Sequence, residues 1–423
     1  MRWTFIVSLV VLLLVGSFLS TINFIKPTQY TFLPNPEGED PTTTVTATTS
    51  LPETIKDGLT ITDIEPQSPL QNPPTTIKGI YATSWSASSA KKMDYLINLI
   101  DTTELNAIVI DIKDYSGYVT YDITVPDVRT YHAYEVRIPK INALIKKLHD
   151  KNIYVIARLA TFQDGRLALA RPDLAMQSSS TGKVWQDKKR LTWMDPASLP
   201  IWDYNIAIAK DALSRGFDEV NFDYIRFATD GAISDIKYPA WNGVTPRATV
   251  IRDFWRYVRT QIPDRAISAD IFGLASVSYD DLGIGQKIEN AFGAFDAIAP
   301  MVYPSHYYSG TLGFQNPADH PYEVVLDSIT KAVARLKLYN SKQTKPITAT
   351  STAFEIAQSE RPTTIRPWLQ DFNLGATYDA TKVRAQIQAV YDAASTTPEL
   401  ISGWMLWNPS NVYTKEALEL TDN

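Results

Sequence analysis

The sequence predicts an α/β protein built as a TIM (β/α)8 barrel, preceded by an N-terminal membrane or signal segment and a disordered Thr/Pro-rich linker. From residue 78 onward, short apolar runs alternate with longer amphipathic segments, and about eight such units fill the chain, as this barrel requires. A doubly wound sheet is disfavoured because no G-x-G-x-x-G or G-x-x-x-x-G-K-S/T motif stands at a strand-to-helix junction. The predicted barrel domain spans residues 78–419.

Composition narrows the class of protein. The 423 residues are 44% hydrophobic and 20% charged, which suffices for a large globular core. A net charge of −6 gives no broad basic surface, so nucleic acid is not an expected partner. The chain has no cysteine, and its four histidines show no HExxH or HxH spacing, so we expect no metal and no cofactor.

Residues 1–25 predict a membrane segment. Arg2 precedes an uncharged apolar run from Trp3 to Ile25, which is long enough to cross a bilayer as a helix of about 20 residues. A cleavable signal peptide normally has a shorter apolar region and an A-x-A-like cleavage site, which this run lacks. We therefore expect a single-pass anchor that holds the barrel outside the cytoplasm at the cell membrane. If the segment is cleaved instead, the protein is secreted.

Residues 26–77 predict a disordered linker. Stretches such as PTTTVTATTSLPE and PQSPLQNPPTT cannot bury enough apolar surface to offset the entropy lost on ordering. A linker of this composition, placed between an apolar helix and a folded domain, holds the domain away from the membrane. A plain disordered leader is the alternative.

Eight segments of the predicted domain are rich in strand-forming residues. The expected strands are 78–85, 107–114, 153–160, 219–227, 266–273, 297–304, 365–372 and 402–409. The amphipathic segments between them predict the helices. The seventh strand has an alternative at 347–354, because Pro367 cannot donate a hydrogen bond to a neighbouring strand within 365–372.

Charged residues inside the expected strands point to function. In DEVNFDYIRFATDG, Asp223 and Arg226 interrupt strand-forming residues, although an unpaired charge in a core is costly. Alternate residues of a barrel strand point inward, and polar ones near its C-terminal end face the mouth, where barrel enzymes keep their chemistry. This rule selects Asp111 and Lys113, Arg158, Asn221 and Asp223, Ser268 and Asp270, Tyr303, and Gln370.

These charges also have a structural interpretation. Asp223 with Arg226 can be an ion pair that anchors the strands. Asp111 with Lys113 and Arg158 can be another. Several acids that converge on one mouth, however, raise the pKa of at least one of them, as paired-carboxylate catalysis requires. The set as a whole therefore favours a catalytic site.

Six segments, in order along the chain, carry a family resemblance: GFDEVNFDYIRF, ISADIFG, DAIAPMVYPSHY, NPADHPYEVV, IRPWLQDF and GWMLWNPSNVY. They resemble the signature segments of a bacterial family of TIM-barrel proteins that is named for glycoside hydrolysis and filed as a domain of unknown function. The resemblance runs from about Lys78 to Tyr413. It implies a TIM barrel, hydrolysis of glycosidic bonds, and a seventh strand at 365–372, with 347–354 in an insertion.

The resemblance and the residues together lead to a catalytic hypothesis. The fourth strand lacks the Asn-Glu acid of cellulase-like barrels, and the DxxDxDxE motif of chitinases is missing too. An Asp that ends the fourth strand is similar to the nucleophile of amylase-like and galactosidase-like groups. We expect Asp223 to act as nucleophile or base and Asp270 as general acid, with Asp111 or Asp114 as the alternative acid. Three basic residues are expected to hold a carboxylate ionised: Arg158, Arg226 and Lys113.

The other candidates are expected to bind the substrate, a polysaccharide or cell-wall glycan. Aromatic rings suit the apolar face of a sugar, and polar groups suit its hydroxyls. The candidates are Lys113, Asp114, Arg158, Arg226, Tyr303, His306, Trp85, Gln370, Trp404 and Asn408. Trp404 and Trp407 have opposite parity, so at most one of them faces the mouth. The alternative function is a non-catalytic, membrane-tethered barrel that binds or scaffolds carbohydrate.

Overall fold

The computed structural model describes residues 62–342 and 362–421. The predicted membrane segment 1–25, most of the predicted linker and the alternative strand 347–354 lie outside these residues. Across the described part of the chain, every helix is too short or too polar to cross a membrane.

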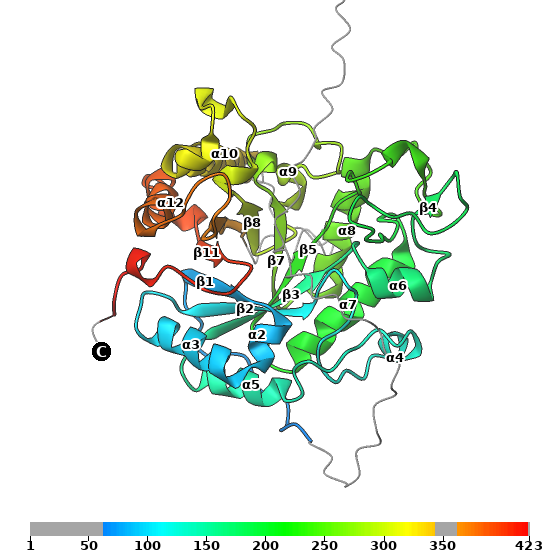
Figure 1. Cartoon of the computed structure of the whole chain (residues 1–423), viewed down its shortest axis with the longest axis horizontal. Helices are drawn as coiled ribbons and strands as arrows, with labels where there is room; N and C mark the ends of the chain where they lie inside the picture. Colours follow the sequence, from blue (N-terminus) through cyan, green and yellow to red (C-terminus); the bar gives the residue numbers. More distant parts are fainter. Residues whose placement is uncertain (1–61, 343–361, 422–423) are drawn as a thin grey trace, which may run out of the picture. The chain divides into compact units, whose positions relative to one another are not determined.

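A closed ring of parallel strands forms the centre of the fold (Figure 1). The strands are β1 (Ile77–Ala82), β2 (Ala107–Lys113), β3 (Tyr154–Ala160), β5 (Glu219–Asp223), β7 (Ala266–Phe272), β8 (Ala297–Met301), β9 (Thr364–Ile365), β10 (Trp368–Gln370) and β11 (Gly403–Trp407). Neighbouring strands pair in the order β10-β11-β1-β2-β3-β5-β7-β8-β9, and β8 also pairs with β10, so the ring closes. The predicted TIM barrel is confirmed.

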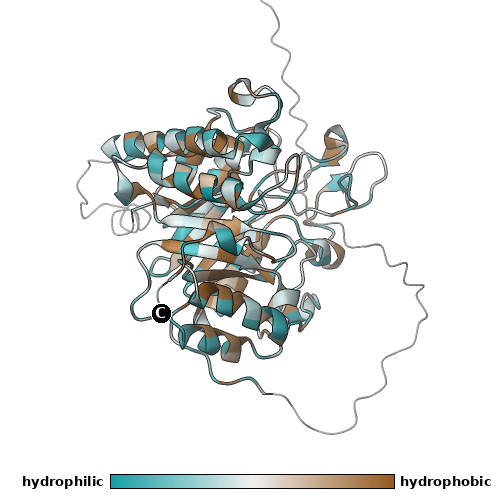
Figure 2. Ribbon diagram, turned by 60° about the vertical axis from the view of Figure 1, so that its left-hand side comes forward, coloured by the Kyte–Doolittle hydropathy of each residue, from teal (hydrophilic) through white to brown (hydrophobic). Residues whose placement is uncertain are grey.

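Helices surround this ring (Figure 1). They are α2 (Ser84–Ser88), α3 (Ala90–Asp101), α4 (Pro126–Thr130), α5 (Ile141–His149), α6 (Gly165–Ala170), α7 (Leu199–Ser214), α8 (Arg247–Gln261), α9 (Ile288–Ala291), α10 (Pro321–Lys342) and α12 (Ala380–Ala393). A small antiparallel pair, β4 (Gln177–Ser178) and β6 (Ile236–Lys237), joins the loops that follow β3 and β5. In Figure 2 the central strands are largely brown and apolar, whereas teal, polar residues are frequent on the helices and loops around them.

The seventh barrel position is an interrupted strand. β9 pairs with β8, and β10 pairs with β11, with Arg366 and Pro367 between the two pieces. Pro367 donates no hydrogen bond but accepts one from the backbone of Met405 at 2.9 Å. The segment 365–372 therefore contributes the seventh strand, as the family resemblance implies.

The fold begins before residue 78, so the predicted linker 26–77 is too long at its C-terminal end. Asp63 accepts hydrogen bonds from the backbone of Asn142 at 2.6 Å and of Ala143 at 3.1 Å, at the start of α5. The backbone N–H of Leu70 donates to the carboxylate of Asp218 at 2.7 Å, and Asp218 directly precedes β5. Residues from 63 onward are thus part of the fold, because their backbone groups find partners on the barrel that composition does not reveal.

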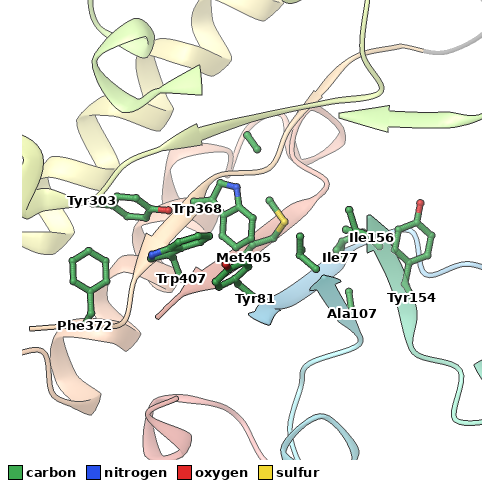
Figure 3. Packing of buried hydrophobic residues seen from close by; sticks show 12 residues of the cluster. Ile77, Tyr81, Ala107, Tyr154, Ile156, Tyr303, Trp368, Phe372, Met405 and Trp407 are labelled. Atoms are coloured by element: carbon green, nitrogen blue, oxygen red, sulfur yellow. The ribbon is translucent and has the colours of Figure 1, made fainter. Parts of the chain in front are cut away.

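The barrel interior has an apolar side and a charged side. Figure 3 shows the apolar cluster, which consists of Ile77, Tyr81, Ala107, Val109, Tyr154, Ile156, Ala299, Tyr303, Trp368, Phe372, Met405 and Trp407. On the charged side, the buried Arg366 donates to Glu219, which also accepts from Ser268. The polar residues of β3, β5 and β7 therefore meet inside the barrel instead of facing water.

Closure of the barrel depends on a glycine at the start of β11. Gly403 has φ +112°, and a Cβ there would lie 1.9 Å from the carbonyl oxygen of Ile77 in β1. We predict that Gly403→Ala lowers the free energy of unfolding by about 3 kcal/mol or more, because both the backbone conformation and the β1–β11 contact must change. Urea denaturation monitored by circular dichroism measures this.

Gly182 is the matched control. Its φ of +68° is also positive, but a Cβ there meets nothing within 4 Å. Gly182→Ala should therefore cost only the conformational penalty of about 1 kcal/mol. Equal losses for the two variants would show that the contact with Ile77 does not control closure.

Candidate active site

Four charged residues from four neighbouring strands meet inside the barrel. The guanidinium of Arg158 in β3 donates from Nη1 to Asp111 Oδ1 at 2.7 Å and from Nη2 to Asp223 Oδ2. Its Nε lies 3.8 Å from Asp270 Oδ2. The register pairs Asp111 with Arg158 and Asn221 with Ser268. Asp223 and Asp270 each lie two residues further along their strands, on the same face as Asn221 and Ser268. The four side chains share one interior, as strand parity predicts.

The site is almost closed to solvent. The exposed fraction is 5% for Asp223, 4% for Asp111, 3% for Arg158 and 2% for Asp270. Of the two expected catalytic carboxyls, Asp223 is therefore the more accessible and Asp270 the deeper.

Asp270 is held by two N–H groups on one oxygen. Trp368 Nε1 donates to Oδ1 at 2.8 Å, and Asn221 Nδ2 donates to the same atom at 2.9 Å. Burial, reinforced by the negative charge of Asp223, raises the pKa of Asp270 to about 8, against the opposing charge of Arg158. Asp270 is therefore mostly protonated at neutral pH.

Asp111 has a different set of partners. The hydroxyl of Tyr81 donates to Oδ2, and Arg158 occupies Oδ1. Burial raises the pKa of Asp111, although the charge of Arg158 opposes this shift. The Tyr81 ring stacks on Trp407 with 3.9 Å between ring centroids, and the Arg158 guanidinium lies 5.0 Å from the centre of the Trp407 ring. An aromatic wall thus borders the charged cluster.

A sharp turn follows Asp223. The backbone N–H of Tyr224 donates to Asp223 Oδ1 at 2.5 Å, and Tyr224 has φ +53°. A left-handed conformation at a bulky residue is unfavourable, and such strain is common at functional sites. The turn ends β5 and brings Asp223 to the last position of the strand.

Tyr303 and His306 line the same interior from the segment after β8. Burial raises the pKa of Tyr303, and the negative charges of Asp270 and Asp223 raise it further. Its ring centroid lies 5.3 Å from that of His306 and 5.6 Å from that of Phe372. Burial lowers the pKa of His306 to about 4, so its imidazole is neutral at pH 7.

Trp85 lies in α2, just after β1, and Asp114 directly follows β2. Trp85 is 60% exposed, and the guanidinium of Arg137 lies 4.7 Å from the centre of its ring. Arg137 in turn bonds Asp114 at 2.7 Å. The negative charge of Asp114 also contributes to the raised pKa of Asp111.

Lys113 does not share a face with Asp111, and this expectation is wrong. A register shift between Asp111 and Lys113 pairs Lys113 with Leu159, so the alternation of side chains breaks at this point. The fully buried Nζ instead contacts Asp164 at 2.7 Å and Asn205 of α7 at 3.0 Å. Lys113 therefore joins β2 to the helix layer.

Arg226 does not contact Asp223, which corrects the proposed ion pair. Its guanidinium lies 4.5 Å from the Trp193 ring and 5.1 Å from the Phe272 ring, and it bonds Asp230 at 2.8 Å. The turn after Asp223 carries Arg226 away from the buried carboxyls. Arg226 therefore orders the loop after β5.

Three further candidates are engaged within the protein. Trp404 is fully buried and donates to the hydroxyl of Tyr391 in α12 at 3.0 Å, so it faces the helices, and Trp407 is the one that faces the site. The amide of Gln370 accepts from Ser305 at 2.8 Å and donates to the carbonyl of Phe372 at 2.9 Å. Asn408 likewise donates to the carbonyl of Asp371. The amide groups of Gln370 and Asn408 bind loops together, and Trp404 faces α12, so the polar groups of these three side chains are engaged within the protein.

Sequence reasoning missed Tyr81 and Trp368. Trp368 has the same parity as Gln370 in the seventh strand, so the rule that selected Gln370 also covered Trp368. Tyr81 stands near the C-terminal end of β1, where the same rule applies. An aromatic residue in a strand is most often part of the core, so residue type alone does not reveal the contacts that Tyr81 and Trp368 make with Asp111 and Asp270. Within residues 62–342 and 362–421, no group of three or more acidic or histidine side chains is arranged to hold a metal ion.

Comparisons with known proteins bear on this site. A family model described as "Putative glycosyl hydrolase domain" matches residues 79–413. A comparison with curated protein sequences found no match. A hypothetical protein from Ruminiclostridium thermocellum, known from a crystal structure, is 36% identical over 48% of this chain and 98% of its own, with a TM-score of 0.43.

Two enzymes are also similar in structure. The α-galactosidase TtGalA from Thermus thermophilus is 12% identical, and the match covers 83% of this chain and 61% of the enzyme, with a TM-score of 0.47. The α-L-fucosidase isoenzyme 2 from Paenibacillus thiaminolyticus is 11% identical over 81% of this chain and 48% of its own, also with a TM-score of 0.47. The family model, which spans most of the chain, confirms the resemblance read from the sequence: the chain belongs to this family of glycosyl hydrolase domains.

Proposed function

We propose that the protein is a glycoside hydrolase that cleaves a polysaccharide or cell-wall glycan with Asp223 and Asp270. The family supports the reaction class. We assign the two roles from the contrast between the surroundings of the two carboxyl groups. Asp223 accepts a charge-assisted hydrogen bond from Arg158, whereas Asp270 accepts from uncharged N–H groups and has a pKa raised to about 8. Carboxyls with such unlike environments suit the separate roles of nucleophile and acid.

In the proposed reaction, Asp270 transfers its proton to the glycosidic oxygen, so that the leaving sugar departs as an alcohol. Asp223 either attacks the anomeric carbon to form a covalent glycosyl intermediate, or takes a proton from the attacking water. In the first path, the Asp270 carboxylate then takes a proton from a water molecule, which displaces Asp223 from the anomeric carbon, so the configuration is retained overall. The second path is a single displacement by water and inverts the configuration. Arg158 orients Asp223 through a direct contact.

The proposed substrate contacts come from the loops at the C-terminal ends of the strands. The exposed ring of Trp85 is supported by Arg137, so a sugar can stack on its free side. Tyr303 and the neutral His306 offer polar atoms to sugar hydroxyls beside the buried carboxyls. Asp114 is a further hydroxyl ligand at the border of the cluster.

A non-catalytic carbohydrate-binding barrel is the second candidate. It is favoured by the contacts of Arg158, which hold Asp111 and Asp223 within a nearly solvent-free interior. Incubation of the protein with a panel of polysaccharides and peptidoglycan separates the two candidates. New reducing ends support the hydrolase, whereas retention of intact glycan without new ends supports the binding barrel.

We also propose that the protein acts outside the cytoplasm. This proposal rests on the apolar run from Trp3 to Ile25, which is followed by a Thr/Pro-rich segment. The expected result is full-length protein in the membrane fraction of cells, accessible to added protease only from the outer side. Released protein whose N-terminus begins between Ser17 and Lys26 would show cleavage, and protease protection in intact cells would contradict the location.

The role of Asp223 can be tested by removing its charge. We predict that Asp223→Asn lowers the rate of glycan cleavage by about 10³-fold or more, because an amide neither attacks the anomeric carbon nor activates water. It should also lower the free energy of unfolding by up to about 3 kcal/mol, since Arg158 loses one of its buried partners. Turnover and thermal melting are measured on the same preparation.

Asp164→Asn is the matched control. It also breaks a buried ion pair, with Lys113, but the amide still caps α6 and the pair lies outside the site. This variant should melt earlier and, when folded, cleave glycan at the normal rate. If Asp223→Asn behaves in the same way, Asp223 is a structural anchor and not a catalytic residue.

The raised pKa of Asp270 predicts a pH dependence. The acid form dominates below about pH 8, so the cleavage rate should fall about tenfold per pH unit above this value. The same group also affects the free energy of unfolding. Because the pKa of Asp270 rises from 3.8 to about 8 on folding, the free energy of unfolding falls as the pH rises between these two values. Asp270→Asn should abolish cleavage and remove this part of the pH dependence of melting. Asp150→Asn, at the exposed position just after α5, should change neither, and an unchanged melting profile for Asp270→Asn would contradict the assignment.

A further inference from the structure

The two oxygens of Asp270 are not equivalent. Oδ1 accepts hydrogen bonds from Trp368 Nε1 at 2.8 Å and from Asn221 Nδ2 at 2.9 Å. The indole N–H group and the amide nitrogen of Asn can donate a hydrogen bond but cannot accept one. A proton on Oδ1 would therefore point at two other donors. Among the residues that the structure describes, Oδ2 has the more distant Arg158 Nε as its polar neighbour, at 3.8 Å.

We infer that Trp368 and Asn221 are positioning residues that confine the acidic proton of Asp270 to Oδ2. The inference deepens the proposed function and rests on it for the use of this proton. In the glycosidase reaction, the Oδ2–H bond breaks, the proton bonds to the glycosidic oxygen, and the negative charge left on Asp270 is stabilised by the two N–H donors on Oδ1.

The orientation of Asn221 is set by a chain of hydrogen bonds below the site. Arg366 donates to Glu219, so Glu219 is an acceptor, and Ser268 must donate its hydroxyl hydrogen to it. The remaining lone pairs of Ser268 Oγ then accept from Asn221 Nδ2 at 3.0 Å. This order leaves the amide nitrogen, and not the amide oxygen, facing Asp270.

The orientation of Trp368 is set by packing. Its side chain is 1% exposed and meets the Trp407 ring edge to face, with 5.6 Å between ring centroids. The indole N–H therefore points to the same carboxyl oxygen without the freedom to turn away.

The charged and titratable groups that face Asp270 come from every neighbouring strand. They are Asp223 of β5, Arg158 of β3, Tyr303 after β8 and Arg366 between β9 and β10, with Glu219 of β5 reached through Ser268. Trp368→Phe alters none of these charges and keeps an aromatic ring. A change in the titration of Asp270 in this variant therefore reports the lost N–H group.

The test compares two tryptophans in the full-length protein. Trp368→Phe removes the donor to Asp270, and Trp404→Phe makes the same chemical change at a fully buried tryptophan that donates to Tyr391 on the helix side. The protonated carboxyl is followed by infrared difference spectroscopy against pH, with Asp270→Asn identifying its band. We expect the titration midpoint to move upward by about one pH unit in Trp368→Phe and to stay in place in Trp404→Phe.

Asn221→Leu provides a second variant if Trp368→Phe does not fold, and it should also move the midpoint upward. The high-pH limb of the cleavage rate should move together with the infrared midpoint. An unmoved midpoint in the folded Trp368 and Asn221 variants, or an equal shift in Trp404→Phe, overturns the inference. A specific shift of the carboxyl band in a protein that cleaves no glycan supports the positioning of the proton and rejects the proposed hydrolase function.

Discussion

The guanidinium of Arg158, which lies among three carboxyls, governs the candidate site inside this barrel. Arg158 bonds Asp111 and Asp223 directly and has only a 3.8 Å contact with Asp270. One positive charge cannot compensate three negative charges where little water enters. Asp270, which lies deepest and feels the charge of Asp223, is the group that keeps its proton. The raised pKa of Asp270 thus follows from its burial and from a shortage of positive charge around it.

The apolar side of the barrel strengthens the effect of this shortage of positive charge. The cluster in Figure 3 includes the rings of Tyr81, Tyr303, Trp368 and Trp407, which border the charged groups and exclude water from them. Electrostatic interactions are stronger in such surroundings than in water. Taking an ion pair out of water usually contributes little net stability, so the network is poorly explained by stability alone. A role for these charges in chemistry or in ligand binding accounts for them better.

Much of the fold was predictable because its signals repeat along the chain. The alternation of short apolar runs with amphipathic segments predicted the barrel, and strand parity predicted that Asp111, Arg158, Asp223 and Asp270 face one interior. Parity failed at Lys113, where a register shift turns the side chain toward the helices. A bulge is a local adjustment to the neighbouring strand, so residue types alone do not announce it.

Where a strand is regular, the sequence by itself determined which residues enter the barrel, because the alternation of side chains is a property of each strand's own backbone. Only the tertiary structure decided which groups bond one another. Trp368 reaches Asp270 across 98 residues of sequence, and Arg226 turns from the neighbouring Asp223 to Asp230. A hydrogen bond depends on the relative position of two strands and on the competing partners around them. These are fixed only when the ring closes and the interior is packed.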